Sequence, residues 1–123
     1  MVQYSFYVSF TGMEAAAYCV SKVNSVTVVG RGSVPFQPVL GEKIGARIKQ
    51  LFDEKGVKFR LGCDVSCFEG DGKVNQVNLS NGETLPADVV ILGIGAHPST
   101  TFLQETGIEM QRGAVVVNKV RVF

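Results

Sequence analysis

The stretch that decides the fold is VVILGIGAHP, residues Val89–Pro98, an apolar run that ends in glycines and a proline. A continuous apolar run of this kind is typical of a parallel strand buried on both faces of its sheet. A second stretch, TGMEAAA at Thr11–Ala17, places a glycine and a glutamate at the start of an alanine-rich helix. Each stretch therefore predicts a junction at the end of a strand in an α/β sheet.

Strands and helices alternate outward from these two junctions. Thr11-Gly12-Met13-Glu14 is a capping-box pattern, and apolar residues follow it at helical spacing, so we expect a helix over residues 11–23. A second helix is expected over residues 40–52, with Lys43, Arg47 and Lys49 on its solvated face. Strands are predicted at residues 2–6, 26–29, 57–61 and 114–117, and a helical turn at residues 101–106.

Two hairpin signals, Gly70-Asp71-Gly72 and Asn81-Gly82, stand one strand length apart. They predict a three-stranded antiparallel meander from about Cys63 to Leu85. The order of elements therefore predicts an α/β fold: a Rossmann-like wound parallel sheet with an antiparallel three-stranded meander insert, in a single domain over residues 1–123. We expect the core strands at residues 26–29, 57–61, 89–92 and 115–117, with both helices packed on them.

Length and charge narrow the class of protein. The chain has 123 residues, enough for one domain, and 46% of them are hydrophobic, which is ordinary for a globular chain. The net charge is +1, so no nucleic-acid partner is indicated. The apolar residues 1–10 are too short to span a bilayer and lack a basic segment, so neither a membrane span nor a signal peptide is predicted. We expect an intracellular chain, cytoplasmic or mitochondrial.

The three cysteines predict neither a disulfide nor a metal site. Cys63 and Cys67 fall on one predicted strand, and four strand steps separate them by about 13 Å, too far for a disulfide. His97 is the only histidine, so a zinc site would lack ligands. We expect Cys19, Cys63 and Cys67 to be reduced core thiols, in line with an intracellular chain.

Six short segments, taken in order, resemble those of a known family. The chain is similar to the NAD(P)H-binding domain of the pyridine nucleotide-disulfide oxidoreductase superfamily, most of all to its apoptosis-inducing-factor-like, ferredoxin-reductase-type flavoproteins. The resemblance covers roughly residues 12–118. The matching segments are GMEAA at 12–16, VTVV at 26–29, LGEKIG at 40–45, EKGVKF at 54–59, ADVV at 87–90 and GIGAHP at 93–98. One such segment is a weak signal, whereas all of them in this order and spacing are specific.

The resemblance implies a part in flavin chemistry. Such proteins hold FAD in a domain that is split in two, with an NAD(P)H domain between the halves, and pass electrons from NAD(P)H to FAD and on to a partner. Both flavin halves are absent from this sequence, which looks like a fragment cut from the middle. The implied ligand is a nicotinamide nucleotide, FAD is not expected to bind here, and a flavin domain or a parent-type protein is a candidate partner. No catalytic residue is assigned, because the two cofactors carry the hydride.

The glycine loop of such a domain is largely missing. A dinucleotide site uses three glycines after its first strand, for the tight turn, for the approach of the pyrophosphate and for helix packing. Gly12 keeps the third place, but the first two hold Tyr7 and Ser9. A side chain in these places costs energy where φ is positive and narrows the approach to the phosphates. The helix N-terminus remains as an anion site, so we expect weak NAD(P)H binding.

Two charged residues belong to the predicted cofactor site. Glu14 matches a glutamate that lies beside the nicotinamide in the family, and it also suits a helix-capping role. Arg31 follows Gly30, the place where NAD-specific members carry an acid for the adenosine ribose. Arg31 suits either a contact with the 2′-phosphate of NADP or an ordinary loop position.

Two glycines complete the predicted site. Gly93 and Gly95 match glycines at which the last strand of the family passes the cofactor. The alternative is that they form a plain tight turn before Pro98, with His97 inside it. With no serine or cysteine nucleophile placed to pair with this histidine, no catalytic triad is predicted.

Two functions remain open for this chain. In the first, it is the NAD(P)H-binding domain of an FAD-dependent oxidoreductase, with FAD supplied by chain not present here. In the second, it is a truncated, non-catalytic remnant that keeps the fold, binds nucleotide poorly and acts, if at all, by protein association. Tyr7 and Ser9 favour the remnant, and the resemblance favours the enzyme domain.

Overall fold

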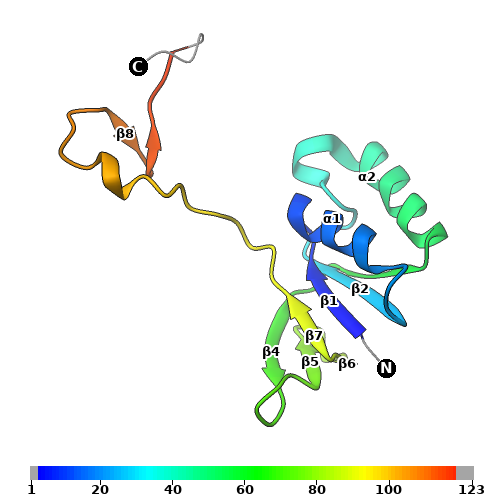
Figure 1. Cartoon of the computed structure of the whole chain (residues 1–123). Helices are drawn as coiled ribbons and strands as arrows, with labels where there is room; N and C mark the ends of the chain where they lie inside the picture. Colours follow the sequence, from blue (N-terminus) through cyan, green and yellow to red (C-terminus); the bar gives the residue numbers. More distant parts are fainter. Residues whose placement is uncertain (1–2, 119–123) are drawn as a thin grey trace.

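The structure, a computed structural model, describes residues 3–118 and contains three β-sheets and two α-helices (Figure 1). The elements are, in order, β1 (Gln3–Tyr7), α1 (Phe10–Cys19), β2 (Ser25–Gly30), α2 (Gln37–Glu54), β3 (Val57–Leu61), β4 (Val65–Glu69), β5 (Gln76–Leu79), β6 (Thr84–Pro86), β7 (Val89–Ile91), a 3₁₀ turn η1 (Thr101–Leu103), β8 (Met110–Gln111) and β9 (Ala114–Val115). This order confirms the predicted sequence of strands, helices and meander.

The main sheet is parallel and has the strand order β3-β2-β1-β7. β1 lies inside it, paired with β2 from Gln3↔Ser25 to Tyr7↔Val29 and with β7 from Tyr4↔Val89 to Phe6↔Ile91. The chain winds outward from β1 to β3 and then returns to the other side of β1. Such a change of direction leaves a crevice at the carboxyl ends of the two strands, where α/β proteins bind their ligands.

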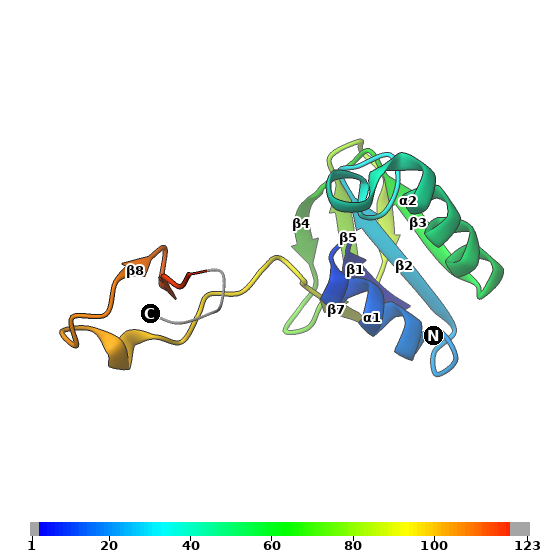
Figure 2. The same cartoon turned by 90° about the horizontal axis from the view of Figure 1, so that it is seen from above.

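The sheet is covered on both faces, and β2 shows why. Successive side chains of a strand point to opposite faces. Val26 and Val28 pack with Met13 and Ala16 of α1, whereas Val29 packs into a second cluster on the other face. Figure 2 shows α1 and α2 on one side of the sheet and the meander on the other.

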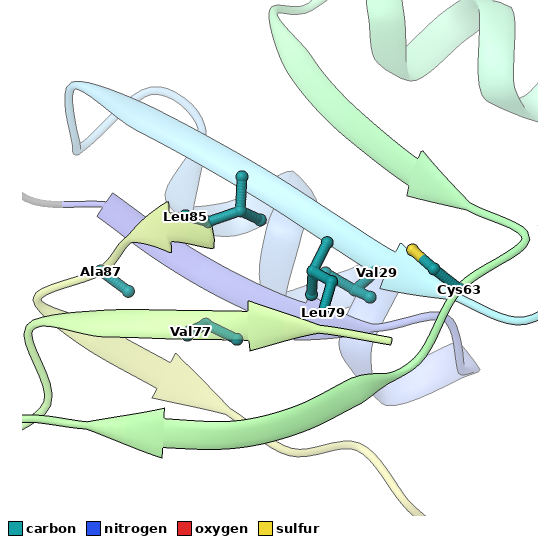
Figure 3. Close-up of a cluster of buried hydrophobic side chains, with 6 residues drawn as sticks. All are labelled: Val29, Cys63, Val77, Leu79, Leu85 and Ala87. Atoms are coloured by element: carbon teal, nitrogen blue, oxygen red, sulfur yellow. The ribbon is translucent and has the colours of Figure 1, made fainter. Parts of the chain in front are cut away.

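The second cluster joins the meander to the parallel sheet (Figure 3). Its buried members come from β2, the β3–β4 connection, the two later strands of the meander and the β6–β7 connection: Val29, Cys63, Val77, Leu79, Leu85 and Ala87. The predicted three-stranded meander is confirmed, with the order β4-β5-β6 and antiparallel pairing throughout. Its Asn81-Gly82 turn is closed by the Glu83 amide, which donates to Asn81 Oδ1 at 3.0 Å, and Gly82 has a φ of +86° that favours glycine.

The expectation that the Val89–Leu92 strand is buried on both faces is wrong. β7 forms an edge of the sheet, and the side chains of Val89 and Leu92 are 38% and 51% exposed. The predicted last strand is also misplaced. β9 pairs with β8 in a separate hairpin rather than joining the parallel sheet, so no further strand covers β7 in the part of the chain that the structure describes. Residues 96–118, the C-terminal arm, lead away from the sheet in both views (Figures 1 and 2).

Both predicted helices form, with different ends. α1 spans Phe10–Cys19 instead of reaching residue 23, because the chain turns after Val20 to enter β2. α2 begins at Gln37, before the expected start at residue 40, since Pro38 in its first turn is compatible with a helix start. Gly41 interrupts it with a φ of +78°, so the regular helix continues from the following residue.

The predicted apolar face of α2 is only partly buried. Ile48 and Phe52 pack on the core cluster around Val28 and Val57. Leu40, Ile44 and Leu51 are exposed, so the helix expected over residues 40–52 packs on the core strands through only part of its apolar side chains. Lys43 and Arg47 are exposed as predicted, whereas Lys49 is half-buried and pairs with Asp53 at 2.7 Å.

The first prediction tests the central place of β2. Val28→Ala removes two methyl groups from a fully buried position and leaves a cavity, so we expect a loss of about 2 kcal/mol in the free energy of unfolding. Val117→Ala makes the same chemical change where the side chain is 46% exposed and should cost far less. Urea unfolding followed by circular dichroism measures both, and equal losses would contradict the described core.

Candidate functional site

The loop between β1 and α1 has an extended backbone. Tyr7 pairs with Val29 as the last residue of β1, and the Val8 amide donates to the Val29 carbonyl at 3.0 Å. Ser9 has φ −142° and ψ 169°, an ordinary extended conformation. Neither residue therefore needs the positive φ that favours glycine, and the backbone strain expected at these two places does not arise.

The N-cap of α1 is Ser9 rather than Thr11, so the predicted capping box is wrong. Ser9 Oγ accepts a hydrogen bond from the Gly12 amide at 3.0 Å, and the Ser9 carbonyl accepts from Met13 at 2.9 Å. The amides of a helix N-terminus are the groups that bind phosphate. The serine hydroxyl occupies one of them, so it competes with a phosphate for the Gly12 amide.

Gly93 lies against this helix start. A methyl group added at Gly93 would stand 2.3 Å from Ser9 Oγ and 3.1 Å from the Gly12 nitrogen. Only a glycine fits so close to the capped end of α1. The two junctions singled out in the sequence therefore meet in space, Gly12 from one and Gly93 from the other.

Two cavities flank Ser9 and Phe10. The β2-side cavity, of about 470 Å³, lies at the carboxyl ends of β1 and β2. It is lined by Val8, Ser9, Phe10, Gly30, Arg31, Gly32, Val34, Phe36, Pro38 and Val39. The β7-side cavity, of about 310 Å³, lies between the start of α1 and the end of β7, and is lined by Ser9, Phe10, Thr11, Leu92, Gly93, Gly95 and Ala96. Together they follow the carboxyl edge of the sheet across the change in strand direction.

The β2-side cavity is mostly apolar. Phe10 and Phe36 stack with their ring centroids 4.4 Å apart and an interplanar angle of 18°. Phe36 holds this place through an unusual left-handed backbone, with φ +59° and ψ 19°. The stacked pair places aromatic carbon in the lining of the cavity, and aromatic side chains suit contact with a planar ring such as a nucleobase.

The far end of the β2-side cavity carries an ion pair. Arg31 Nε lies 2.7 Å from Asp64 Oδ2. Gly30, where the resemblance implies an acid in NAD-specific proteins, is closely packed, because an added Cβ would stand 2.4 Å from Val8 Cγ2. A carboxylate side chain at Gly30 would clash with Val8 unless Val8 moved. The valine side chain therefore occupies the space that an acidic side chain at this position would need.

The remaining predicted residues divide between the cavities and the surface. Gly95 lines the β7-side cavity with a φ of +115°. Glu14 is exposed on α1 and lines neither cavity. His97 is exposed, and the segment from Leu92 to Thr100 is extended rather than a tight turn, which corrects that alternative.

Cys19, Cys63 and Cys67 do not line either cavity. Cys63 is buried, and burial raises the pKa of its thiol, with Glu83 and Asp64 adding to the rise and Arg60 opposing it. Cys67 is exposed, so the expectation of a core thiol is wrong there. Within residues 3–118 no group of three or more histidine, cysteine and acidic side chains could hold a metal ion, and no helix of that range is long and apolar enough to cross a bilayer.

Sequence reasoning missed several residues of the site, among them Val8, Phe10, Phe36 and Asp64. Phe36 stands two residues before Pro38, which marks a helix start, but its left-handed backbone has no sequence signal. Asp64 is 33 residues from Arg31, and only the pairing of β2 with β3 brings the two together.

Residues 9–120 match the sequence model of the pyridine nucleotide-disulphide oxidoreductase family. The chain belongs to this family. The match covers both junctions, the meander and the hairpin that follows, so it confirms the resemblance derived from the motifs.

Individual relatives agree with this assignment. The chain is 42% identical over 113 residues to apoptosis-inducing factor 3 of Homo sapiens, covering 90% of this chain and 19% of the relative. It is 36% identical over 92 residues to the ferredoxin–NAD(+) reductase subunit of the benzene 1,2-dioxygenase system of Pseudomonas putida, covering 75% of this chain and 22% of that one. The chain thus spans about a fifth of the length of these curated relatives.

A solved structure agrees in fold. The FAD-dependent pyridine nucleotide-disulphide oxidoreductase of Desulfovibrio vulgaris superposes with a TM-score of 0.82 at 26% identity. The superposition covers 95% of this chain and 30% of that chain. The Rossmann-like class predicted from the sequence is therefore confirmed, and the matched region is one part of a larger enzyme.

The second prediction separates the observed cap from the expected one. Ser9→Ala removes the hydroxyl that accepts from Gly12, so the chain should lose about 1 kcal/mol of stability. Thr11→Ala is the matched control, because Thr11 is exposed inside the helix and should change stability by at most a few tenths. Thermal unfolding of both variants measures the difference, and a larger loss for Thr11→Ala would restore the capping box.

Proposed function

We propose that the chain is the pyridine-nucleotide-binding domain of an FAD-dependent oxidoreductase, which positions NAD(P)H for hydride transfer to a flavin held elsewhere. The observation that carries the proposal is the pair of cavities that meet at the N-terminus of α1, on the carboxyl edge of a parallel sheet. This is where wound α/β sheets bind dinucleotides. We take residues 1–123 as one such domain.

Each half of the nucleotide has a place in this proposal. The adenosine occupies the β2-side cavity against Phe10 and Phe36. The pyrophosphate lies at the start of α1 beside Gly93, where it displaces Ser9 Oγ from the Gly12 amide. The nicotinamide occupies the β7-side cavity beside Gly95, and Glu14 lies one helical turn away from Phe10 along α1.

The protein's contribution to the reaction is position. The bound nucleotide supplies the hydride, and the helix N-terminus and the glycines orient it. In this proposal both cavities along the carboxyl edge of the sheet belong to the one nicotinamide nucleotide. We therefore assign no flavin-binding residue to this chain.

The third prediction concerns nucleotide affinity. NADH should bind no tighter than in the high micromolar range, because Ser9 Oγ occupies the Gly12 amide. Ser9→Gly frees this amide at little cost to the helix, and one hydrogen bond to a charged group is worth about 1.5–3 kcal/mol. We expect at least tenfold tighter binding by titration calorimetry. Ser21→Gly, an exposed serine after α1, is the control and should leave the affinity unchanged.

The same titration tests the function itself. Binding of NADH that improves on Ser9→Gly supports a phosphate at the α1 N-terminus. Equal affinity in the two proteins would move the phosphate away from Gly12. No binding at millimolar NADH in either protein would rule out the nucleotide site.

The fourth prediction concerns the flavin. The purified 123-residue chain should be colourless, since no residue assigned here contacts an isoalloxazine ring. Visible absorption and released FAD after denaturation are the measurements. A stoichiometric flavin would contradict the assignment of both cavities to one nicotinamide nucleotide.

A second candidate function is association with another chain, without catalysis. The observation that favours it is the exposed apolar side chains in the segment that follows β7: Ile94 and Phe102 are 71% and 78% exposed. Sedimentation velocity across a range of concentrations measures such association. If the chain associates, replacing Ile94 and Phe102 by serine should weaken it, while replacing exposed Tyr18 on α1 should not.

A further inference from the structure

We infer that Asp64 is a specificity-positioning residue, which holds and neutralises Arg31 so that the β2-side cavity prefers an adenosine without a 2′-phosphate. The inference rests on the proposed function, since it concerns the same cavity. Without Asp64, Arg31 would instead favour the nucleotide that carries the 2′-phosphate.

The first step is the place of Arg31. Arg31 is positively charged, and the other described residues that line the β2-side cavity have uncharged side chains. It follows the end of β2, where the adenosine ribose of a bound dinucleotide lies in a wound sheet. An unneutralised guanidinium at this point would attract a phosphate through a bidentate contact.

The second step is how Asp64 reaches Arg31. Beyond the strand ends, the β2–β3 pairing continues through two backbone hydrogen bonds, from Cys63 to the Gly30 carbonyl at 3.3 Å and from Gly62 to the Gly32 carbonyl at 3.2 Å. These bonds place the residues after β3 beside those after β2. The fold therefore brings the carboxylate to the arginine without any signal in the local sequence.

The third step is that the carboxylate is held. Asp64 Oδ1 accepts from the Val65 amide at 2.9 Å, while Oδ2 lies 2.7 Å from Arg31 Nε. The Asp64 carbonyl accepts from Ser80 at 2.8 Å, and the Asp64 amide donates to Ser80 Oγ at 3.0 Å. The aspartate is thus fixed between the parallel sheet and the meander.

The fourth step concerns the energy of a bound phosphate. A 2′-phosphate that reached Arg31 would also come near the Asp64 carboxylate and meet like-charge repulsion. An exposed ion pair adds little to folding stability, so its removal should leave the fold intact. The main consequence of the pair is therefore expected in ligand selectivity.

The experiment compares two ligands that differ only in the 2′-phosphate, adenosine 5′-monophosphate and adenosine 2′,5′-bisphosphate. Asp64→Asn keeps an oxygen for the Val65 amide and removes the charge. We expect it to raise the affinity for the bisphosphate about fivefold and to leave the monophosphate affinity unchanged. The gain should shrink as salt is added, and it should vanish in the double variant with Arg31→Gln.

The control is Glu83→Gln, which removes the same charge from a similar pair. Glu83 Oε1 lies 2.6 Å from Arg60 Nε, and the side chains of Glu83 and Asp64 are 34% and 35% exposed. Glu83 lines neither cavity, so this variant should not change the ratio of the two affinities. NMR titration of backbone amides measures binding in the wild type and every variant, and the spectra report folding.

Each outcome decides the inference. A selective gain for the bisphosphate in Asp64→Asn alone supports it. An equal change for both ligands, a loss for the bisphosphate, or the same gain in Glu83→Gln would overturn it while leaving the nucleotide site in place. If neither ligand shifts any resonance at millimolar concentration, the proposed function fails, and this inference fails with it.

Discussion

The burial of β2 on both of its faces is the constraint on which the rest of the structure depends. Val28 faces the helices and Val29 faces the meander, and both are fully buried. Because adjacent residues of one strand belong to two different cores, neither covering layer can be lost without exposing the strand. The same strand carries Gly30 and Arg31 to the edge of the cavity, so stability and the candidate site share one element.

The candidate site keeps two glycines at the start of α1, Gly12 and Gly93, but places the side chain of Ser9 beside them and that of Val8 beside Gly30. Gly93 still approaches the start of α1 as closely as a glycine permits, and Gly12 still begins the helix. Ser9 is the helix cap, and its hydroxyl occupies the Gly12 amide, which the proposed function gives to a phosphate. Val8 fills the space beside Gly30, where relatives with an acid would need room. These contacts explain why the fold is retained with a weaker expected affinity.

Sequence reasoning placed Gly12 near the start of a helix and Gly93 after an apolar strand, and the structure agrees with both positions. The role of Gly12, Gly93 and Gly95 in nucleotide binding stays a prediction. Sequence reasoning failed at Val89 and Leu92, since an apolar run describes what a strand can bury and not what is available to cover it. It failed at Thr11 because Ser9 and Thr11 are both good caps, and only the direction of the chain leaving β1 selects between them.

The sequence alone determined the order of elements, the antiparallel meander and the family, because periodicity and turn chemistry are local properties. The tertiary structure decided which distant groups meet. Asp64 reaches Arg31 only through the pairing of β2 with β3, Phe36 reaches Phe10 only through a left-handed residue, and β9 joins β8 instead of the main sheet. Such contacts depend on the relative placement of whole elements, which no single stretch of sequence encodes.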